Sequence, residues 1–248
     1  VFSAIIPCSK QDLESQKLKD LLASIRSQNF PQDQIETLVI TEGDSEQAKA
    51  IGIRRARGEI CVMFCADNKI MDNKLFSRTY NCMSIFNANF CYQKFYMTCS
   101  LDNSLNRYFS LIGSNDPVAF YLGKADRKPY YEFDDDEFFT LMEFKDKIPS
   151  LGDNGFFIRR EVLNQANLDH YYPMDCMQDL IRMGKRTFLR MNGASIWHRT
   201  SDNLFTFLRK RYKYARDLYC DRQDRRWKML DTKEDYQRLL WFIASTLT

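Results

Sequence analysis

The chain has 248 residues, of which 44% are hydrophobic and 14% aromatic, a composition that supports a sizeable core and excludes an intrinsically disordered chain. Its net charge of +3 is too small to indicate a partner, and no segment has the roughly 20 consecutive apolar residues of a membrane span. The eight cysteines form no Cys-x-x-Cys pair, which favours reduced core thiols in a cytosolic protein over disulfides or a zinc site.

The first 70 residues alternate between strand and helix patterns. Strands are predicted over 1–7, 35–41 and 58–70, and helices with apolar side chains at helical spacing over 11–28 and 45–58. In the second helix, Ser45 is the expected N-cap and Gly58 the expected stop. Because strand-forming residues begin at once, we expect no signal peptide. A strand–helix alternation of this kind predicts an α/β fold with parallel strands, the nucleotide-binding half of a doubly wound sheet.

The pattern after residue 70 is less regular. A helix is predicted over 72–87, a strand over 90–100, and two short helices within 102–124. An acidic loop follows over 130–138, then a strand that enters a helix over 155–163, a helix over 174–185, and short strands over 187–190 and 194–198. From residue 201 onward the chain is helical in pattern and basic.

Polar residues lie at the C-terminal end of each of the first three predicted strands. Pro7 and Ser9 lie at the end of the first strand, Glu42 directly after the second, and Asp67 with Asn68 near the end of the third. Because parallel strands end at the same edge of a sheet, these residues should lie together where such sheets bind ligands. A carboxylate on the second strand end can accept hydrogen bonds from a base or ribose.

A bound phosphate at this edge would need a cation. The chain has neither a GxGxxG nor a GxxxxGK[ST] loop, so no glycine loop cradles phosphates. A divalent ion held by Asp67, Mg²⁺ or Mn²⁺, would suit because these ions take carboxylate, water and phosphate oxygens. Arg54 and Arg55 on the intervening helix could add positive charge. For any one strand end, a simple polar loop cap is an equal alternative.

The ordered segments "IIPCSK", "LLASIRSQ" and "LVITEGDSEQAKAIGIRRARGEICVMFCADN" resemble glycosyltransferase family 2, the inverting nucleotide-sugar enzymes of GT-A fold. The resemblance is good over residues 1–70 and looser to about 200. It implies that Glu42 contacts the base, that Asp67 belongs to the DxD-like metal motif, and that His198 completes the metal–diphosphate site. For His198, a packed or hydrogen-bonded histidine after a strand is an equal alternative. This chain departs from the motif at Cys65, which replaces the first acid.

The second half of the chain resembles the acceptor side of the same family. "PSLGDNGFFIRREVL" and "YPMDCMQDLIRMGK" match its glycine-rich turn and the helix that carries the catalytic base. Inversion needs one carboxylate to take the proton of the acceptor hydroxyl as that hydroxyl attacks the sugar. The candidates are Asp175 by motif position and Asp153 by its glycine-flanked turn, with Asp179 one helical turn further on. Each of them could instead be an ordinary turn or helix-start acid.

Residues 209–228 contain nine lysines and arginines against three aspartates, interleaved with aromatic side chains. Followed by the apolar run "LLWFIASTLT", they are typical of a juxtamembrane belt that faces an anionic membrane surface. A nucleic-acid patch or a plain solvated helix face are the alternatives. We expect no nucleic-acid partner. The expectation is that the natural protein continues into transmembrane helices, with the catalytic domain on the cytoplasmic face of the membrane.

Together these features predict a glycosyltransferase domain over 1–200, with a nucleotide-binding half over 1–70 and an acceptor half over 71–200. A basic helical segment over 201–248 follows. The predicted reaction moves a sugar from a UDP- or GDP-sugar to a lipid-linked or cell-surface glycan. The rival functions are a nucleotidyltransferase, which normally has a glycine-rich basic loop that "PCSKQDLES" lacks, and a non-catalytic nucleotide-sugar or nucleic-acid binding module.

Overall fold

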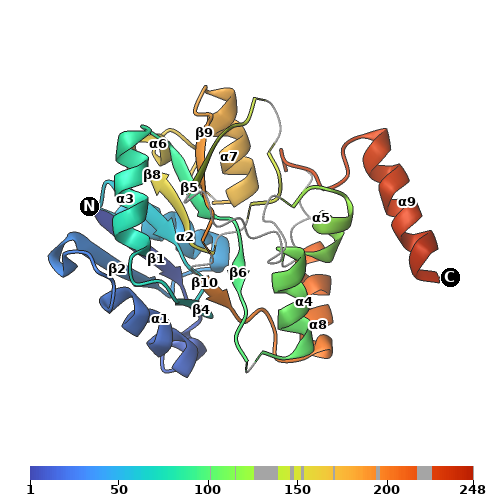
Figure 1. Cartoon of the computed structure of the whole chain (residues 1–248), viewed down its shortest axis with the longest axis horizontal. Helices are drawn as coiled ribbons and strands as arrows, with labels where there is room; N and C mark the ends of the chain where they lie inside the picture. The colour runs from blue at the N-terminus through green and yellow to red at the C-terminus, as the bar shows by residue number, and fades with distance from the viewer. Residues whose placement is uncertain are drawn as a thin grey trace.

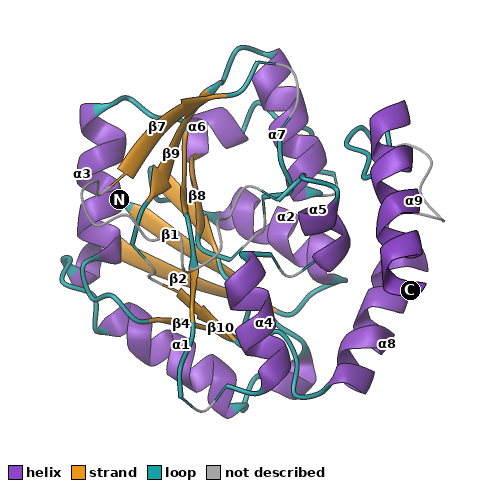
Figure 2. Ribbon diagram, turned by 45° about the vertical axis from the view of Figure 1, so that its right-hand side comes forward, coloured by secondary structure: helices purple, strands orange, loops and turns teal. Residues whose placement is uncertain are grey.

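The structure is a computed structural model that describes residues 1–100, 102–114, 116–125, 139–145, 148–151, 154–169, 171–193, 196–216 and 225–247. Its centre is a seven-stranded sheet with strand order β2-β1-β3-β8-β5-β9-β7 (Figures 1 and 2). The strands are β1 (Phe2–Pro7), β2 (Ile35–Ile40), β3 (Ile60–Met63), β5 (Phe90–Gln93), β7 (Phe139–Glu143), β8 (Phe156–Arg159) and β9 (Thr187–Met191).

The strand directions place several strand ends at one edge of this sheet. β1 is parallel to β2 and β3, and β5 is parallel to β9. β8 is antiparallel to both β3 and β5, so β5 runs in the same direction as β3. The edge at which β1, β2, β3, β5 and β9 end is called the carboxyl edge below; β8 starts there. The predicted α/β class is confirmed, although β8 and β7 make the sheet mixed rather than parallel throughout.

Helices cover both faces of the sheet. On one face α1 (Gln16–Arg26) and α3 (Leu75–Ile85) bury their apolar sides, with Phe2 and Phe157 among the buried residues. On the other face α2 (Ser45–Arg55), α6 (Arg160–Leu163) and α7 (Pro173–Arg182) pack over Tyr92 and Phe156. Burial of these side chains from water on both faces is the main term that stabilises the three layers.

Both ends of α2 lie at other residues than predicted, for local structural reasons. Asp44, not Ser45, is the N-cap: its Oδ1 accepts from the backbone N–H groups of Glu46 and Gln47, at 2.9 and 2.8 Å. The helix ends at Arg55, before Gly58. Gly58 is needed for another reason, because a Cβ there would lie 2.5 Å from the backbone carbon of Phe2. The residue lets this segment approach β1 closely.

The third predicted strand, over 58–70, forms two strands in different sheets. β3 ends at Met63, and a turn follows in which the Asn68 side chain accepts from the backbone N–H of Cys65 at 3.0 Å. β4 (Asn68–Ile70) then joins β10 (Ile196–His198) and β6 (Tyr96–Met97) in a separate three-stranded sheet. Asp67 therefore lies in the turn between the two sheets.

The described parts of the C-terminal region pack against the domain. Phe207 of α8 (Leu204–Tyr214) contacts Phe109 of α4 (Ser104–Ile112), with ring centroids 4.7 Å apart. α9 (Lys233–Leu247) contacts the end of α5 (Pro117–Tyr121), and an ion pair of 2.8 Å joins its Asp235 to Lys124. Within the described ranges, no helix has both the length and the apolar character required to cross a bilayer.

Candidate functional site

The ends of β1 and β2 meet at the carboxyl edge, as predicted. The backbone N–H of Cys8 donates to the carbonyl of Ile40 at 2.9 Å, which holds the turn after Pro7 beside the end of β2. The hydroxyl of Ser9 donates to Asp12 Oδ2 at 2.6 Å and caps a short 3₁₀ turn. Ser9 is thus placed at the predicted edge with a local structural partner.

Glu42 follows β2 in an exposed loop and pairs with Arg55. Arg55 Nη2 donates to Glu42 Oε1 at 2.8 Å, and this hydrogen bond lowers the pKa of Glu42 below its usual value. Arg54 is directed elsewhere, because its Nη1 donates to the carbonyl of Leu168 at 2.6 Å. Of the two predicted arginines, the structure brings Arg55 to the strand-end carboxylate.

Asp67 lies beside His198, 131 residues later in the chain. The small sheet makes this contact: β10 pairs with β4 so that His198 is opposite Asn68, and His198 Nε2 lies 3.3 Å from Asp67 Oδ1. Burial by itself would raise the pKa of Asp67, but His198, Lys210 and Lys17 outweigh it and lower the pKa below its usual value. The carboxylate is therefore ionised at neutral pH.

A network of hydrogen-bonded side chains holds Asp67 and His198 in this contact. Asn68 donates to Asn154 Oδ1 at 3.0 Å, and Asn154 in turn donates to the Tyr96 hydroxyl at 3.0 Å. Asn154 Nδ2 also lies 3.4 Å from His198 Nδ1, as does the Thr200 hydroxyl. Asn68 is thus a positioning residue of the edge, a role the sequence alone did not distinguish from ligand contact.

Gly155, next to Asn154, has a backbone conformation that favours glycine. Its φ is +68°, and a Cβ at this position would clash with Ile196 of β10. Its N–H donates to the carbonyl of Met63 at 2.8 Å, which ties the start of β8 to the end of β3. Tyr96, Asn154 and Thr200 were not predicted as site residues from the sequence. The only sequence signal for Asn154 is the glycine beside it, which marks a close backbone approach.

The two candidate metal ligands, Asp67 and His198, suit a divalent ion that completes its coordination shell with ligands from outside the protein. Among the residues that the structure describes, Asp67 Oδ1 is a buried atom that accepts no hydrogen bond. Two neighbouring ligands of an ion bound at about 2.1 Å lie about 3 Å apart, close to the 3.3 Å between Asp67 Oδ1 and His198 Nε2. Within the described ranges no group of three or more His, Cys, Asp or Glu side chains surrounds a metal position. Mg²⁺ commonly takes one or two protein ligands and completes its shell with phosphate and water oxygens.

Asp175, the candidate base, is buried in the first turn of α7 with 1% exposure. Its Oδ2 accepts from Arg225 Nε at 2.8 Å, and its Oδ1 accepts from the backbone N–H of Trp227 at 2.8 Å. In this arrangement both oxygens anchor the segment that leads to α9, so neither is open to an acceptor hydroxyl. The base assignment stays a prediction.

The other two acids considered for the base are placed differently. Asp179, one turn further along α7, pairs with Arg226 at 2.8 Å and is partly exposed. Asp153 lies outside the described residues, as does the predicted acidic loop over 130–138.

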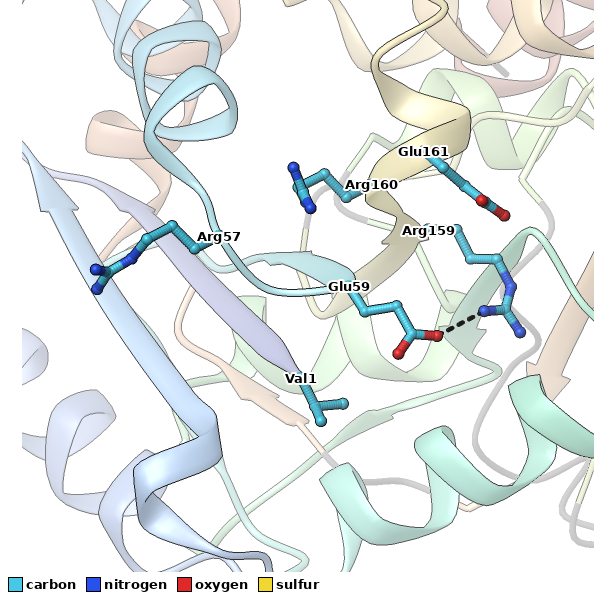
Figure 3. A pocket seen from close by; sticks show the side chains of 6 residues that line it. All are labelled: Val1, Arg57, Glu59, Arg159, Arg160 and Glu161. Carbon is cyan, nitrogen blue, oxygen red and sulfur yellow. Dashed lines mark hydrogen bonds and ion pairs between the residues drawn. The ribbon is translucent and has the colours of Figure 1, made fainter.

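A charged pocket lies at the opposite edge of the sheet (Figure 3). It is lined by Val1, Arg57, Glu59, Arg159, Arg160 and Glu161. Arg159 pairs with Glu59 at 3.0 Å and donates to the carbonyl of Ala88, so its guanidinium ties β8 to neighbouring segments. The predicted strand-end residues all lie at the other edge, and this pocket is not part of the candidate site.

Comparison with solved structures reveals a shared architecture. TarS 1–349 from S. aureus superposes with a TM-score of 0.54 at 12% sequence identity, over 98% of this chain and 70% of TarS. The fold is of the GT-A type. The same TarS chain has been solved with UDP and with UDP-GlcNAc. The mannosyltransferase PcManGT of Pyrobaculum calidifontis, in complex with GDP-Man and Mn²⁺, gives a TM-score of 0.52 at 12% identity, over 85% of this chain and 60% of that one.

Sequence comparison adds nothing to the structural matches. No known family model matches the chain, and no curated protein sequence matches it. The chain spans 59% of the TarS chain solved with UDP and 42% of a longer TarS chain. At 11–13% identity these matches establish the fold, and the activity has to be argued from the site.

Proposed function

We propose that the chain is an inverting glycosyltransferase of the family 2 type that takes its sugar from a UDP- or GDP-sugar. The observation that carries the proposal is the contact between Asp67 and His198, 3.3 Å apart at the carboxyl edge of a GT-A sheet. TarS binds UDP and UDP-GlcNAc, and PcManGT binds GDP-Man with Mn²⁺. These complexes support a nucleotide-sugar donor and a divalent ion here.

Each residue at the edge has a task in this reaction. The loop of Glu42 and Arg55 would hold the base or ribose through its paired charges. Asp67 and His198 would hold Mn²⁺ or Mg²⁺, which when bound supplies positive charge for the leaving diphosphate. Asn68 and Asn154 keep those two ligands in place, as outer-shell partners of metal ligands do.

Inversion requires one displacement at the anomeric carbon. The acceptor hydroxyl gives its proton to a carboxylate, its oxygen bonds to C1, and the bond from C1 to the diphosphate oxygen breaks. Asp175 and Asp153 are the proposed carboxylates. In the arrangement described above, Asp175 takes this role only if the segment with Arg225 and Trp227 moves away from it.

A non-catalytic nucleotide-sugar binding module is the second candidate. Two observations favour it: Cys65 replaces an acid of the DxD-like motif, and Asp175 is fully engaged by Arg225 and Trp227. Such a module would bind donor without hydrolysing or transferring the sugar. Release of nucleoside diphosphate from a bound donor distinguishes the two functions.

The donor proposal predicts thermal stabilisation by particular nucleotide sugars. A ligand at 100 times its Kd stabilises the folded state by about 2.7 kcal/mol, enough to raise the melting temperature by several degrees. The measurement is the melting temperature with UDP-GlcNAc, UDP-glucose or GDP-mannose, each with Mn²⁺ and with EDTA. We expect at least one donor to stabilise the chain more with Mn²⁺. If no nucleotide sugar stabilises it under either condition, the donor assignment is wrong.

We further propose a lipid-linked or surface-glycan acceptor, met at the cytosolic leaflet of a membrane. α8 exposes large apolar side chains beside cations: Phe205 is 78% exposed and Tyr212 71%, and Arg209 and Lys213 are also exposed. A helix of this kind lies well in a membrane interface, where each cation near an anionic surface contributes about 1 kcal/mol. The exposed side chains of α8 therefore support the predicted membrane surface, whereas Arg225 and Trp227, further along 209–228, are held by Asp175.

This placement predicts salt-sensitive binding to anionic vesicles. The chain should float with phosphatidylserine-containing liposomes at low salt and be released as salt rises. The double variants Phe205→Ser/Tyr212→Ser and Arg209→Ser/Lys213→Ser should each lose binding. Ile85→Ser is the matched control, because Ile85 is 73% exposed on α3. Absence of flotation by the wild type at low salt would contradict the membrane proposal and favour a soluble acceptor.

A further inference from the structure

Lys210 is a cation on α8 that reaches from the C-terminal region back to the carboxyl edge. Its Nζ donates to the carbonyl of Thr200 at 2.9 Å. The Thr200 hydroxyl lies 3.4 Å from His198 Nδ1, and the other ring nitrogen of His198 lies 3.3 Å from Asp67 Oδ1. Two residues, Thr200 and His198, thus connect Lys210 to Asp67, the proposed ligand of the ion.

The packing of α8 places Lys210 on the side of the helix that meets the domain. Side chains three and four residues apart share one side of a helix. Phe207, three residues before Lys210, is 6% exposed and packs on Phe109 of α4 (Figure 1). The side chains proposed above to meet the membrane, among them Phe205 and Tyr212, lie about half a helical turn away from Phe207. Lys210 therefore belongs to a different side of α8 from the proposed membrane surface.

The surroundings of Asp67 carry more positive than negative charge. After burial, which acts in the opposite direction, and the neighbouring histidine, Lys210 and then Lys17 lower the pKa of Asp67. Such an effect requires the charges to lie within about 10 Å of each other. Lys17, at the start of α1, also lies 3.8 Å from Asp202, which has a closer partner in Arg199 at 3.0 Å. Within this group of described residues, three cations meet two carboxylates.

A diphosphate is a ligand that this charge distribution suits. Cys65 replaces the first acid of the DxD-like motif, so an ion at Asp67 would have one carboxylate fewer to hold it. An ammonium beside that position can contact phosphate oxygens directly, because it carries three hydrogen-bond donors and a full charge. The contact with Thr200 uses one of these donors, and Lys210 is an exposed residue, so a bound phosphate can reach it.

We propose that Lys210 binds the diphosphate of the nucleotide, beside the ion position at Asp67. The inference rests on the proposed function, because it requires a nucleotide-sugar donor at this edge, and it adds a donor-binding residue from outside the strand ends. In the transfer reaction, the ammonium stabilises the charge of the leaving nucleoside diphosphate. One consequence is that part of the nucleotide affinity needs no divalent ion.

The test is calorimetric titration of the full chain with UDP and GDP, and with uridine and guanosine, in EDTA at low salt. Lys210→Met should weaken binding of the preferred nucleotide by about tenfold or more, because a hydrogen bond to a charged group is lost. Binding of the matching nucleoside, which has no phosphate, should be unchanged. Lys210→Arg keeps the charge and should retain most of the affinity. Lys19→Met is the matched control, because Lys19 is an exposed lysine that pairs with Glu14 at 3.1 Å.

Two other roles for Lys210 predict different results. A lysine that only holds Thr200 in place would, when replaced, lower the melting temperature and weaken nucleotide and nucleoside alike. A lysine that only influences Asp67 would repel a bound cation. In that case Lys210→Met would bind Mn²⁺ more tightly in the absence of nucleotide, and its affinity for UDP or GDP in EDTA would equal that of the wild type.

The proposal is overturned if Lys210→Met binds the nucleotides in EDTA as tightly as the wild type, if it loses nucleoside affinity to the same extent, or if the wild type binds nucleotide only with Mn²⁺. Failure of the donor assignment is a different result, in which the wild type binds neither UDP nor GDP under either condition. Inorganic pyrophosphate in EDTA is then the probe. Binding that depends on Lys210 supports its role toward a diphosphate, and absence of binding by the wild type overturns it.

Discussion

Asp67→Ala should weaken Mn²⁺-dependent binding of UDP or GDP by at least about 100-fold. Loss of a residue that only supports a metal ligand already costs 10–100-fold in metal affinity, and Asp67 is proposed to be the ligand itself. The lowered pKa of Asp67 means that the carboxylate is charged throughout the neutral range and available to hold the ion. The measurement is calorimetric titration of nucleoside diphosphate with Mn²⁺ and, separately, with EDTA.

Two variants serve as comparisons for Asp67→Ala. Glu42→Ala should weaken nucleotide binding both with and without Mn²⁺, because Glu42 is proposed to contact the base or ribose rather than the ion. Asp33→Ala removes an exposed carboxylate and should change neither affinity. Nucleotide binding by Asp67→Ala at wild-type strength in the presence of Mn²⁺ would show that Asp67 does not hold the ion.

The first half of the fold was predictable because its signals are local. Alternation of buried strands with amphipathic helices determines the parallel arrangement of β1, β2 and β3. That arrangement is sufficient to bring the segments after these strands to one edge. The error at the N-terminus of α2 was a single residue, because Asp44 and Ser45 are both good caps and only the hydrogen bonds distinguish them.

The features that the sequence did not predict depend on long-range pairing. β7 is an edge strand with half-exposed residues, and it carries little periodic signal. The small sheet joins segments around residues 68, 96 and 196, and no local pattern indicates that three short strands so far apart will pair. The resemblance placed Asp67 and His198 in one site, and only this small sheet supplies their 3.3 Å contact.

Asp175 illustrates the same limit for a functional assignment. Its position at the start of α7 follows from the sequence, because an apolar helical pattern begins there. Its environment is set by Arg225 and Trp227, about 50 residues later, in a basic stretch whose composition predicts a juxtamembrane belt. Of that stretch, Trp227 is buried in the main core and its indole N–H donates to the carbonyl of Ile148 at 3.0 Å.

The burial of Asp175 predicts a large loss of stability on substitution. Asp175→Asn should lower the free energy of unfolding by about 3–5 kcal/mol, because it removes the charge of one member of a buried ion pair. Asp179→Asn is the matched control on the same helix. Asp179 pairs with Arg226 at the same 2.8 Å, but these side chains are 20% and 36% exposed, so its loss should cost less than about 1 kcal/mol. Urea unfolding measures both.

The activity of the Arg225→Met variant distinguishes the two possible roles of Asp175, which are to anchor the segment that leads to α9 and to act as the catalytic base. Both Asp175→Asn and Arg225→Met break the buried pair, so an anchor alone predicts that sugar transfer falls in parallel with stability in the two variants. A base predicts a different result: Asp175→Asn loses transfer by about 10²–10⁴-fold while still binding donor, and Arg225→Met, which keeps the carboxylate, loses far less. Equal losses in both variants, together with loss in Asp153→Asn, would assign the base to Asp153. Asp175 would then hold the segment that leads to α9.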